Sequence, residues 1–298
     1  MKTQKNACEF DQELIDLYDY YAHGHIDRRT FLERAARFAV GGLTALALLD
    51  LLSPSYALAA QVPEADPRVA SERITFSSPD GHREGRGLLV RPVGPVVRRP
   101  VVLVVHENRG LNPYIEDVAR RVALAGFIVF APDALHSLGG YPGNDDEGRA
   151  LQQKLDRDKI IEDFAAAARL LNSHHESNGA LGVVGFCFGG FMANTLAWRL
   201  PSIVKAAVPY YGGQPTAEQA ALIKGALLLH YASLDTRVNA GWPAYEQALQ
   251  AAKIDYEAHI YPDVNHGFHN DTTPRFDESA AKLSWSRTID FLNRKLRA

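Results

Sequence analysis

Apolar runs and helix-type patterns alternate along the chain from about residue 62 onward. Continuous Val-rich or Leu-rich runs are typical of strands buried on both faces, whereas apolar residues three to four positions apart are typical of helices. The runs predict strands at 101–107, 127–135, 181–186, 204–212, 225–233 and 256–262. The patterns between and after them predict helices at 113–126, 157–172, 188–199, 243–252 and 277–296. This alternation predicts an α/β fold with a mainly parallel central sheet and helices on both faces.

A hairpin is expected ahead of this sheet, at 74–92, with Pro-Asp-Gly at 79–81 as its turn. We therefore divide the chain into an N-terminal extension, 1–60, and a body, 61–298. The full chain has 298 residues, of which 46% are hydrophobic, and this is ample for a sizeable core. Its net charge of −3 and the lack of a basic stripe give no indication of nucleic-acid binding.

The N-terminal extension has two interpretations. A twin arginine at 28–29 is followed by Phe-Leu, an apolar run at 38–52 and the sequence Ala57-Leu58-Ala59. This order resembles a twin-arginine export signal and would place the protein in the periplasm. The preceding stretch is long and acidic, however, and charges interrupt the apolar run. The second interpretation is a cytoplasmic protein whose extension forms amphipathic helices at about 10–21 and 28–52, which dock on the body or on a partner subunit; the sequence leaves both interpretations open.

The apolar run at 38–52 is also too short and interrupted to predict a membrane-spanning helix. Any membrane contact would come through the N-terminal extension alone. The only cysteines, Cys8 and Cys187, cannot form a disulfide framework. We find no Cys-x-x-Cys motif and no His-rich cluster, so the sequence predicts no metal site and no cofactor.

The sequence GFCFGG at 185–190 places Cys187 between glycines, after an apolar strand and before a helix. A strand, a Gly-x-nucleophile-x-Gly turn and a helix form a nucleophile elbow, which exposes the central side chain at the edge of the sheet. The N-terminus of the helix lowers the pKa of a thiol at that position. The alternative is a small buried cysteine that only packs in a tight turn.

Two downstream residues favour chemistry over packing. Asp235 follows the strand at 225–233, and His266 follows the strand at 256–262. This is the chain order of an α/β-hydrolase triad, nucleophile, acid and histidine, with each residue where a strand of a parallel sheet ends. His269 and Asp263 are rival candidates. We favour His266 because it comes first after the strand, and Asp263 fits a turn after Pro262.

The motifs GFCFGG, LDTRV and NHGF together resemble those of the dienelactone hydrolase family of α/β-hydrolases, over about residues 70–298. The resemblance implies an α/β-hydrolase fold and a Cys-His-Asp triad. Cys187 would be the nucleophile, His266 the general base and acid, and Asp235 the partner that orients the histidine.

The sequence VVHENRG at 104–110 also resembles the family and places Glu107 beside the nucleophile. The resemblance implies that this glutamate contacts the thiol and helps to deprotonate it; alternatively, Glu107 pairs with Arg109 or another cation. The backbone N–H groups of Asn108 and Phe188 would form the oxyanion hole.

The chain departs from the family where arginines hold the substrate carboxylate. The first such region carries His136 but no arginine, and Arg275 is the nearest arginine after His266. Recognition of a carboxylate is therefore an open question. The sequence at 138–149 is expected to form a flap over the site. Four side chains are candidates for substrate contact: Tyr114, His136, Tyr141 and Trp242.

The sequence thus predicts a hydrolase that cleaves a small ester or lactone through a thioester, without metal or organic cofactor. One alternative is a non-catalytic binding protein on the same fold, assembled as a homodimer through the N-terminal helices. The other is a redox-sensing thiol, although no second cysteine lies nearby in the sequence to resolve an oxidised Cys187.

Overall fold

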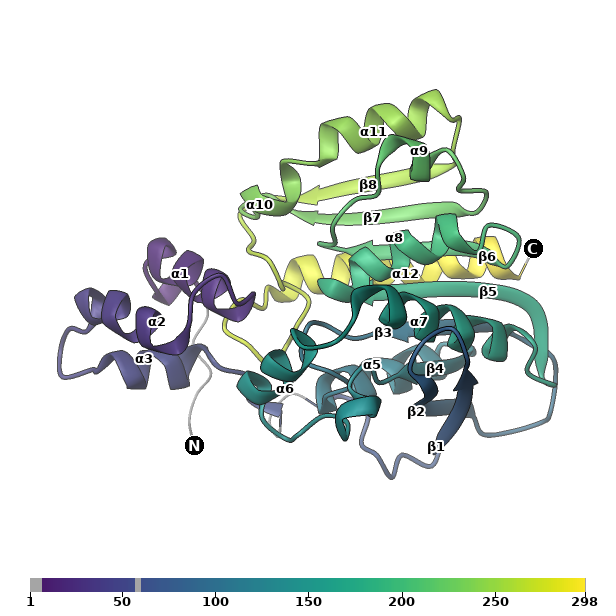
Figure 1. The fold of residues 1–298 in the computed structure, drawn as a ribbon, viewed down its shortest axis with the longest axis horizontal. Coiled ribbons are helices and arrows are strands. Elements are labelled where there is room, and N and C mark those ends of the chain that lie inside the picture. The colour runs from purple at the N-terminus through teal and green to yellow at the C-terminus, as the bar shows by residue number, and fades with distance from the viewer. Residues whose placement is uncertain (1–6, 57–59, 298) are drawn as a thin grey trace.

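A computed structural model describes residues 7–56 and 60–297. Its centre is an eight-stranded sheet in the order β1-β2-β4-β3-β5-β6-β7-β8 (Figure 1). The strands are β1 Val69–Ser78, β2 Arg83–Pro92, β3 Arg99–Val105, β4 Ile128–Pro132, β5 Ser177–Phe186, β6 Val204–Tyr210, β7 Ala226–Ala232 and β8 Tyr256–Tyr261. β2 is antiparallel to both its neighbours, and every pair from β4 to β8 is parallel. The predicted hairpin and mainly parallel sheet are confirmed.

Helices cover both faces of this sheet. They are α5 Pro113–Leu124, α6 Asp145–Gln152, α7 Arg157–Asn172, α8 Phe188–Arg199, α9 Ala217–Ala220, α10 Thr236–Asn239, α11 Trp242–Ala251 and α12 Glu278–Leu296, with a 3₁₀ turn, η3, at His136–Leu138. α5 and α12 pack in one core, whereas α7, α8 and α11 pack in a second core. The predicted α/β-hydrolase architecture is therefore present.

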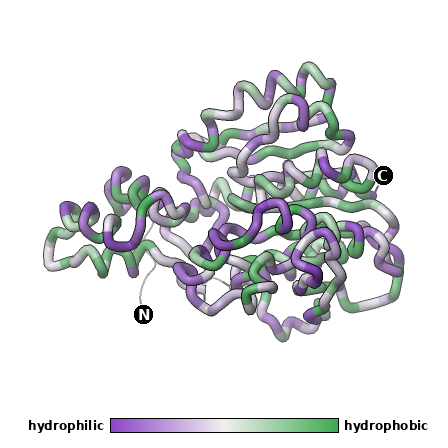
Figure 2. The backbone as a smooth tube through the Cα atoms, viewed as in Figure 1, coloured by the Kyte–Doolittle hydropathy of each residue, from purple (hydrophilic) through white to green (hydrophobic). Residues whose placement is uncertain are grey.

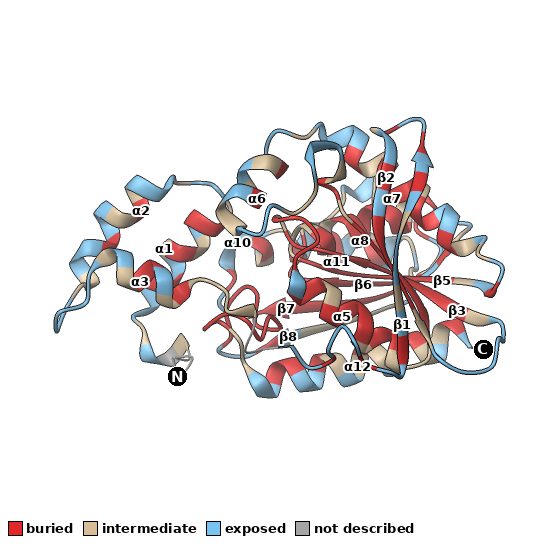
Figure 3. Ribbon diagram, turned by 90° about the horizontal axis from the view of Figure 1, so that it is seen from below, coloured by how far each residue is buried: buried red, intermediate tan, exposed pale blue. Residues whose placement is uncertain are grey.

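The side chains of β3 show why the sheet is buried twice. Val102 and Val104 lie in the core with α5 and α12, and Val101, Leu103 and Val105 lie in the core with α7 and α8. Successive side chains of a strand point to opposite faces, so a run without polar residues needs an apolar layer on each side. Figure 2 shows that hydrophobic residues predominate along the central strands, and Figure 3 shows that these strands are buried.

The N-terminal extension forms helices α1 Gln12–Ala22, α2 Arg28–Ala35 and α3 Ala45–Leu52, with 3₁₀ turns η1 Ala7–Glu9 and η2 Ala36–Phe38. They share a small core of their own, which includes Leu14, Tyr18, Phe31 and Leu52. The prediction of one helix over 28–52 was wrong. Gly41 and Gly42 adopt positive φ angles of 64° and 86°, which break the helical path.

This three-helix unit lies beside the ends of β7 and β8, where the parallel strands terminate (Figure 1). Ser55 donates a backbone hydrogen bond of 2.7 Å to Thr272, and the Tyr56 hydroxyl donates one of 2.7 Å to Asp145. None of the described helices has the length and apolar character needed to cross a membrane. The proposed cleavage sequence Ala57-Leu58-Ala59 lies outside the described residues.

Candidate active site

Cys187 lies in a strained turn between β5 and α8. Its backbone has φ 57° and ψ −110°, and it directly precedes the first residue of α8. A side chain at Gly189 would meet the Val105 backbone oxygen at 2.2 Å, and one at Gly185 would meet the Gly189 oxygen at 1.9 Å. Only glycine allows so close an approach between strand and helix. The turn has the geometry of a nucleophile elbow, with the thiol at the N-terminus of α8.

Asp235 and His266 come together next to this turn. Asp235 follows β7 as the N-cap of α10, and its backbone partner is the Val238 N–H at 3.1 Å. His266 Nδ1 lies 2.6 Å from Asp235 Oδ2, and both side chains are almost fully buried. Nε2 of His266 is buried and has no hydrogen-bond partner among the described residues. The carboxylate therefore fixes the ring and leaves Nε2 for the reacting groups.

The thiol has a second histidine neighbour, which comes from the N-terminal extension. His23, the C-cap of α1, places Nε2 3.2 Å from Cys187 Sγ. Its ring packs edge-on against the ring of His266, with 4.6 Å between the centroids. Nδ1 of His23 contacts the Asp19 backbone oxygen at 2.8 Å and the Asp19 carboxylate at 3.3 Å.

The charges of this cluster shift its proton equilibria together. Burial alone raises the pKa of the Cys187 thiol, but His23 and His266 outweigh burial and hold that pKa well below its usual range. Burial lowers the pKa of His266, but Asp235, the thiolate and Asp19 outweigh it and raise the pKa to about 10. These shifts favour a thiolate beside an imidazolium over the neutral pair.

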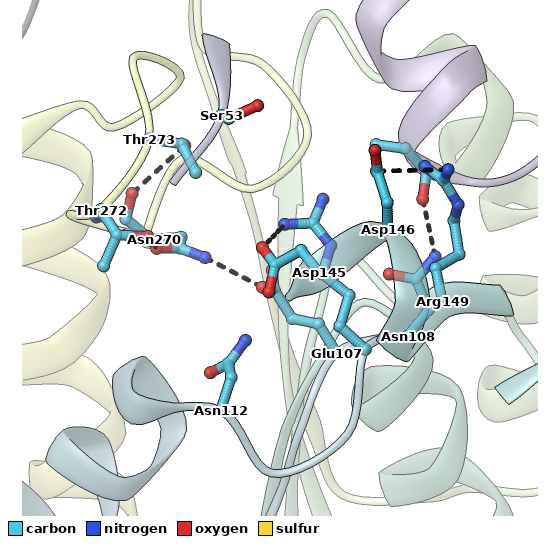
Figure 4. Close-up of polar contacts among 12 residues, drawn as sticks. Ser53, Glu107, Asn108, Asn112, Asp145, Asp146, Arg149, Asn270, Thr272 and Thr273 are labelled. Atoms are coloured by element: carbon cyan, nitrogen blue, oxygen red, sulfur yellow. Dashed lines mark hydrogen bonds and ion pairs between the residues drawn. The ribbon is translucent and has the colours of Figure 1, made fainter. Parts of the chain in front are cut away.

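Glu107 is buried close to the thiol but has a different partner. Its carboxylate accepts a hydrogen bond of 2.9 Å from the Asn270 amide, as Figure 4 shows. Burial raises the pKa of Glu107. The side-chain amide of Asn108 donates a hydrogen bond of 2.8 Å to the Ala22 backbone oxygen, which connects the segment after β3 to α1. The N–H of Phe188, in the first turn of α8, has no acceptor within its own helix.

A cavity of about 490 Å³ opens beside Cys187. Its apolar wall comes from Phe188, Phe191, Leu155, Ile160 and Val238, and its polar wall includes His23, His266, Tyr211, Arg149, Arg157 and Arg237. Among the described residues, no aspartate or glutamate lines it. The hydroxyl of Tyr211 is buried and has no partner in the described part of the chain. The cavity is therefore lined by apolar side chains together with three arginines.

A model of the dienelactone hydrolase family matches residues 86–296, and a model described as YqhI-like matches residues 1–39. A curated protein of Escherichia coli K12, described as "Putative hydrolase fragment YghX", is 65% identical over 114 residues, 38% of this chain and 97% of that protein.

A Bradyrhizobium protein described as "Probable 2-oxo-3-(5-oxofuran-2-ylidene)propanoate lactonase" is 30% identical over 241 residues, 75% of this chain and 96% of that protein. A crystal structure described as "Putative Dienelactone Hydrolase" from Klebsiella pneumoniae shares the fold, with a TM-score of 0.66 and 24% identity over 76% of this chain and 99% of that one. The chain belongs to the dienelactone hydrolase family. The predicted family and the predicted enzyme class, a hydrolase, are confirmed.

Within this family fold, the four expected substrate contacts lie away from the cavity. Tyr114 is buried, and its hydroxyl lies 2.7 Å from His269 Nδ1. Trp242 is buried among aromatic rings at the start of α11. The Tyr141 hydroxyl donates a hydrogen bond of 2.9 Å to Asp145. Nε2 of His136 lies 3.3 Å from the carboxylate of Glu84, near the start of β2. Each side chain has a structural partner, and none lines the cavity beside Cys187.

The expected flap at 138–149 is not a loop throughout, because its residues 145–149 belong to helix α6. Its Arg149 lines the cavity. The rival histidine, His269, faces the core, where burial lowers its pKa to about 3. The rival acid, Asp263, has φ 55° in the turn after β8.

Three ligand-type atoms, from His23, Cys187 and His266, lie within 4.8 Å of one another. These side chains are the ones that could hold a soft metal ion, and both histidines have a carboxylate on the opposite nitrogen. Sequence reasoning found no such cluster because His23 is separated from Cys187 by 164 positions and carries no motif.

Sequence reasoning also missed Asp19, Asn270 and the arginines of the cavity. The amide of Asn270 follows the catalytic loop by only a few residues, so its position was a usable signal. No signal distinguished Arg149, Arg157 and Arg237 from other surface arginines, because the fold alone brings α6, α7 and α10 to one cavity.

Proposed function

We propose that this protein hydrolyses a small carboxylic ester or lactone through a thioester formed on Cys187. The observation that carries the proposal is the convergence of three groups. A thiol at a nucleophile elbow lies near a histidine whose Nε2 is unpaired among the described residues, and a buried carboxylate holds Nδ1 of that histidine at 2.6 Å. This is the arrangement required for nucleophilic acyl transfer.

In the first half-reaction, the Cys187 thiolate attacks the carbonyl carbon, and a C–S bond forms while the carbonyl π-electrons move to oxygen. The N–H groups of Asn108 and Phe188 are the proposed donors to that oxyanion. When the tetrahedral intermediate collapses, the C–O bond breaks and His266 gives its Nε2 proton to the leaving alkoxide. In a lactone, this alkoxide remains attached to the acyl group.

In the second half-reaction, neutral His266 removes a proton from water, and the resulting hydroxide attacks the thioester. The C–S bond breaks, so the thiolate returns beside a protonated histidine and the carboxylic acid leaves. Asp235 stabilises the imidazolium in both halves. We assign the exchanged proton to histidine and not to Glu107, because the Glu107 carboxylate is engaged by Asn270.

We further propose that the substrate carries an anionic group. Three arginines line the cavity, and no described acid lines it, so the field there favours an anion. Arg149 is paired with Asp146 and Arg237 with Asp19. Arg157, at the first position of α7, lies over the Phe191 ring and makes no ion pair with a described residue. Its guanidinium is the best placed of the three to bind a carboxylate.

The first experiment measures hydrolysis of p-nitrophenyl acetate, p-nitrophenyl butyrate, an uncharged lactone and a dienelactone with a free carboxylate. Each is tested with the wild type and with Cys187→Ala. We expect turnover that disappears in Cys187→Ala. Turnover that survives the substitution would remove Cys187 as nucleophile. If no substrate is turned over, a binding protein or a redox-sensing thiol becomes the better explanation.

A second experiment tests the anionic group. Arg157→Gln is expected to raise KM for the carboxylate-bearing lactone roughly tenfold or more, the loss of one charge-assisted hydrogen bond. KM for the uncharged lactone should stay unchanged. Arg169→Gln, an exposed arginine at the other end of α7, is the control. Equal effects of Arg157→Gln on both lactones would contradict the assignment.

Export by the twin-arginine route and assembly through the N-terminal helices are further proposals. The sequence order at 28–59 supports export, whereas the packing of α1 to α3 supports retention of the extension. N-terminal sequencing of the natively expressed protein tests cleavage after Ala59 or Ala60. Val40, Leu43 and Leu46 are exposed apolar side chains of the extension and would support a homodimer, which light scattering tests.

A further inference from the structure

We propose that His23, supplied by the N-terminal extension, is a catalytic residue that holds the Cys187 thiolate. This inference rests on the proposed function, and it adds a second histidine to the triad. The contact is direct: His23 Nε2 lies 3.2 Å from the sulfur that attacks the substrate. The thiol of the body thus has a polar partner from a segment outside the α/β body.

The orientation of His23 is fixed from behind. Its Nδ1 faces the backbone oxygen of Asp19 at 2.8 Å and the carboxylate at 3.3 Å. A hydrogen bond at Nδ1 leaves Nε2 directed at the sulfur, as the Asp235 contact does for His266. Two Asp–His pairs therefore converge on one sulfur atom, from opposite ends of the chain.

Asp19 is held by a residue of the body, and it therefore fixes the position of His23 relative to the body. Arg275, which is almost fully buried, donates a hydrogen bond of 3.0 Å to Asp19 Oδ1. Arg237 lies 3.6 Å from Asp19 and 3.1 Å from His23 Nε2. Asp19 and the thiolate supply the negative charge that balances these cations. Asp19 acts on the sulfur through His23 and His266, and Arg275 acts through Asp19, so both are positioning residues.

The position of His23 is compatible with turnover. The cavity beside Cys187 remains open with His23 in its wall, so substrate can reach the sulfur without displacement of α1. A side chain that blocked the active site would instead fill this cavity. Two histidines also allow a division of labour: His23 stabilises the thiolate, which frees His266 to give its proton to the leaving alkoxide.

Charged groups face the thiol from several elements. They are His23, the C-cap of α1, Glu107 after β3, Arg237 from α10 and His266 after β8, and Asp19 of α1 lies behind His23. The pKa values agree with the geometry. Burial lowers the pKa of His23, but the thiolate and Asp19 outweigh burial and raise it, whereas the pKa of the thiol falls. The thiolate and each histidine thus stabilise each other's charged forms, whereas the charge of His266 opposes that of His23.

The test measures the thiol without substrate. The rate of alkylation of Cys187 by iodoacetamide is recorded against pH for the full-length wild type, His23→Ala and Asp19→Asn. We expect the midpoint of the alkylation profile to rise by about one pH unit or more in His23→Ala, because one unit is a tenfold change in the ionisation equilibrium. Asp19→Asn should shift it in the same direction by less. Arg37→Gln is the control, because among the described residues Arg37 contacts only the extension, through an exposed ion pair with Glu13 and the ring of Phe38.

Hydrolysis of the best substrate of the panel is then measured with the same variants. We expect kcat to fall roughly tenfold or more in His23→Ala, because one pKa unit is a tenfold change in the ionisation equilibrium of the nucleophile. An alkylation–pH profile and a kcat that both stay unchanged in His23→Ala would overturn the proposal. Faster alkylation together with faster hydrolysis would also overturn it, because His23 would then be a residue that blocks access to the thiol. Circular dichroism verifies folding of each variant. Because alkylation needs no turnover, failure here is distinguishable from failure of the proposed hydrolysis.

Discussion

At the residue scale, two histidines three positions apart show how surroundings decide chemistry. The pKa of His266 is raised to about 10, and the pKa of His269 is lowered to about 3. Both are buried, and burial lowers both pKa values. His266 differs because the Asp235 carboxylate, the thiolate and Asp19 overcome burial, whereas His269 has Arg121 as its charged neighbour. Only His266 can therefore hold a proton at neutral pH and release it to a leaving group.

Replacement of Asp235 by Asn should remove the charge that keeps His266 protonated. The pKa of His266 is then expected to fall, and kcat to fall by roughly 10²- to 10⁴-fold, as for other positioned acid–base groups. The checks are ester hydrolysis and an NMR titration of His266. A wild-type rate in Asp235→Asn would mean that another carboxylate orients the ring.

Replacement of Glu107 by Gln distinguishes the two possible acceptors of the thiol proton. A glutamine oxygen can still accept the hydrogen bond from Asn270, so the fold should be preserved. We expect less than about a tenfold change in kcat, because histidines and not Glu107 pair with the thiolate. A loss comparable to that of His23→Ala would instead return Glu107 to the role that the family resemblance implies.

At the element scale, the proposed chemistry depends on the junction of β5 and α8. β5 delivers Cys187 beside the end of β3, because Val105 and Gly185 are paired in register. The strained φ at Cys187 persists because Gly185 and Gly189 let strand and helix approach each other closely. The helix then presents its N-terminal N–H groups to the site.

Gly189→Ala should therefore destabilise the fold by roughly 1–3 kcal/mol, the usual cost of forced overpacking. A methyl group there would meet the Val105 backbone oxygen at 2.2 Å. Gly213→Ala is the matched control for stability, because its methyl group would meet only Phe191, at 3.8 Å. Urea unfolding followed by circular dichroism gives both free energies. Equal values for the two variants would show that the junction is looser than this packing requires.

At the scale of the whole molecule, the N-terminal extension is part of the site and not an appendage. Its helices have a separate core, yet Asp19 reaches Arg275 and His23 reaches Cys187. Burial raises the pKa of Asp19, but the charges of His266, His23 and Arg275 outweigh burial and hold it well below its usual value. Docking of the extension is therefore linked to the ionisation of Asp19.

This linkage has a definite sign. A carboxyl group whose pKa is lower in the folded state adds stability above its unfolded pKa, about 3.9 for Asp, and loses it as pH falls through the folded value. Asp19→Asn should therefore lower the thermal midpoint at pH 7, and the difference from the wild type should shrink in acid. Thermal scans at pH 7 and about pH 3 check this. A difference that grows in acid would contradict it.

The sequence by itself determined the features that are local in the chain. Buried strands of the central sheet are apolar runs, the elbow is six consecutive residues, and the order of Cys187, Asp235 and His266 follows from successive strand ends. The prediction of one helix over 28–52 was wrong because Gly41 and Gly42 interrupt it, and the apolar residues around them concealed this break.

Only the tertiary structure decided which side chains surround the sulfur. Tyr114 and Trp242 looked available for substrate, but packing places both in the core. Arg149, Arg157 and Arg237 reach one cavity because α6, α7 and α10 meet at the same end of the sheet. His23 reaches Cys187 through the docking of a separate helical unit. The His23–Cys187 contact joins residues 164 positions apart, and it depends on side-chain packing that no local pattern encodes.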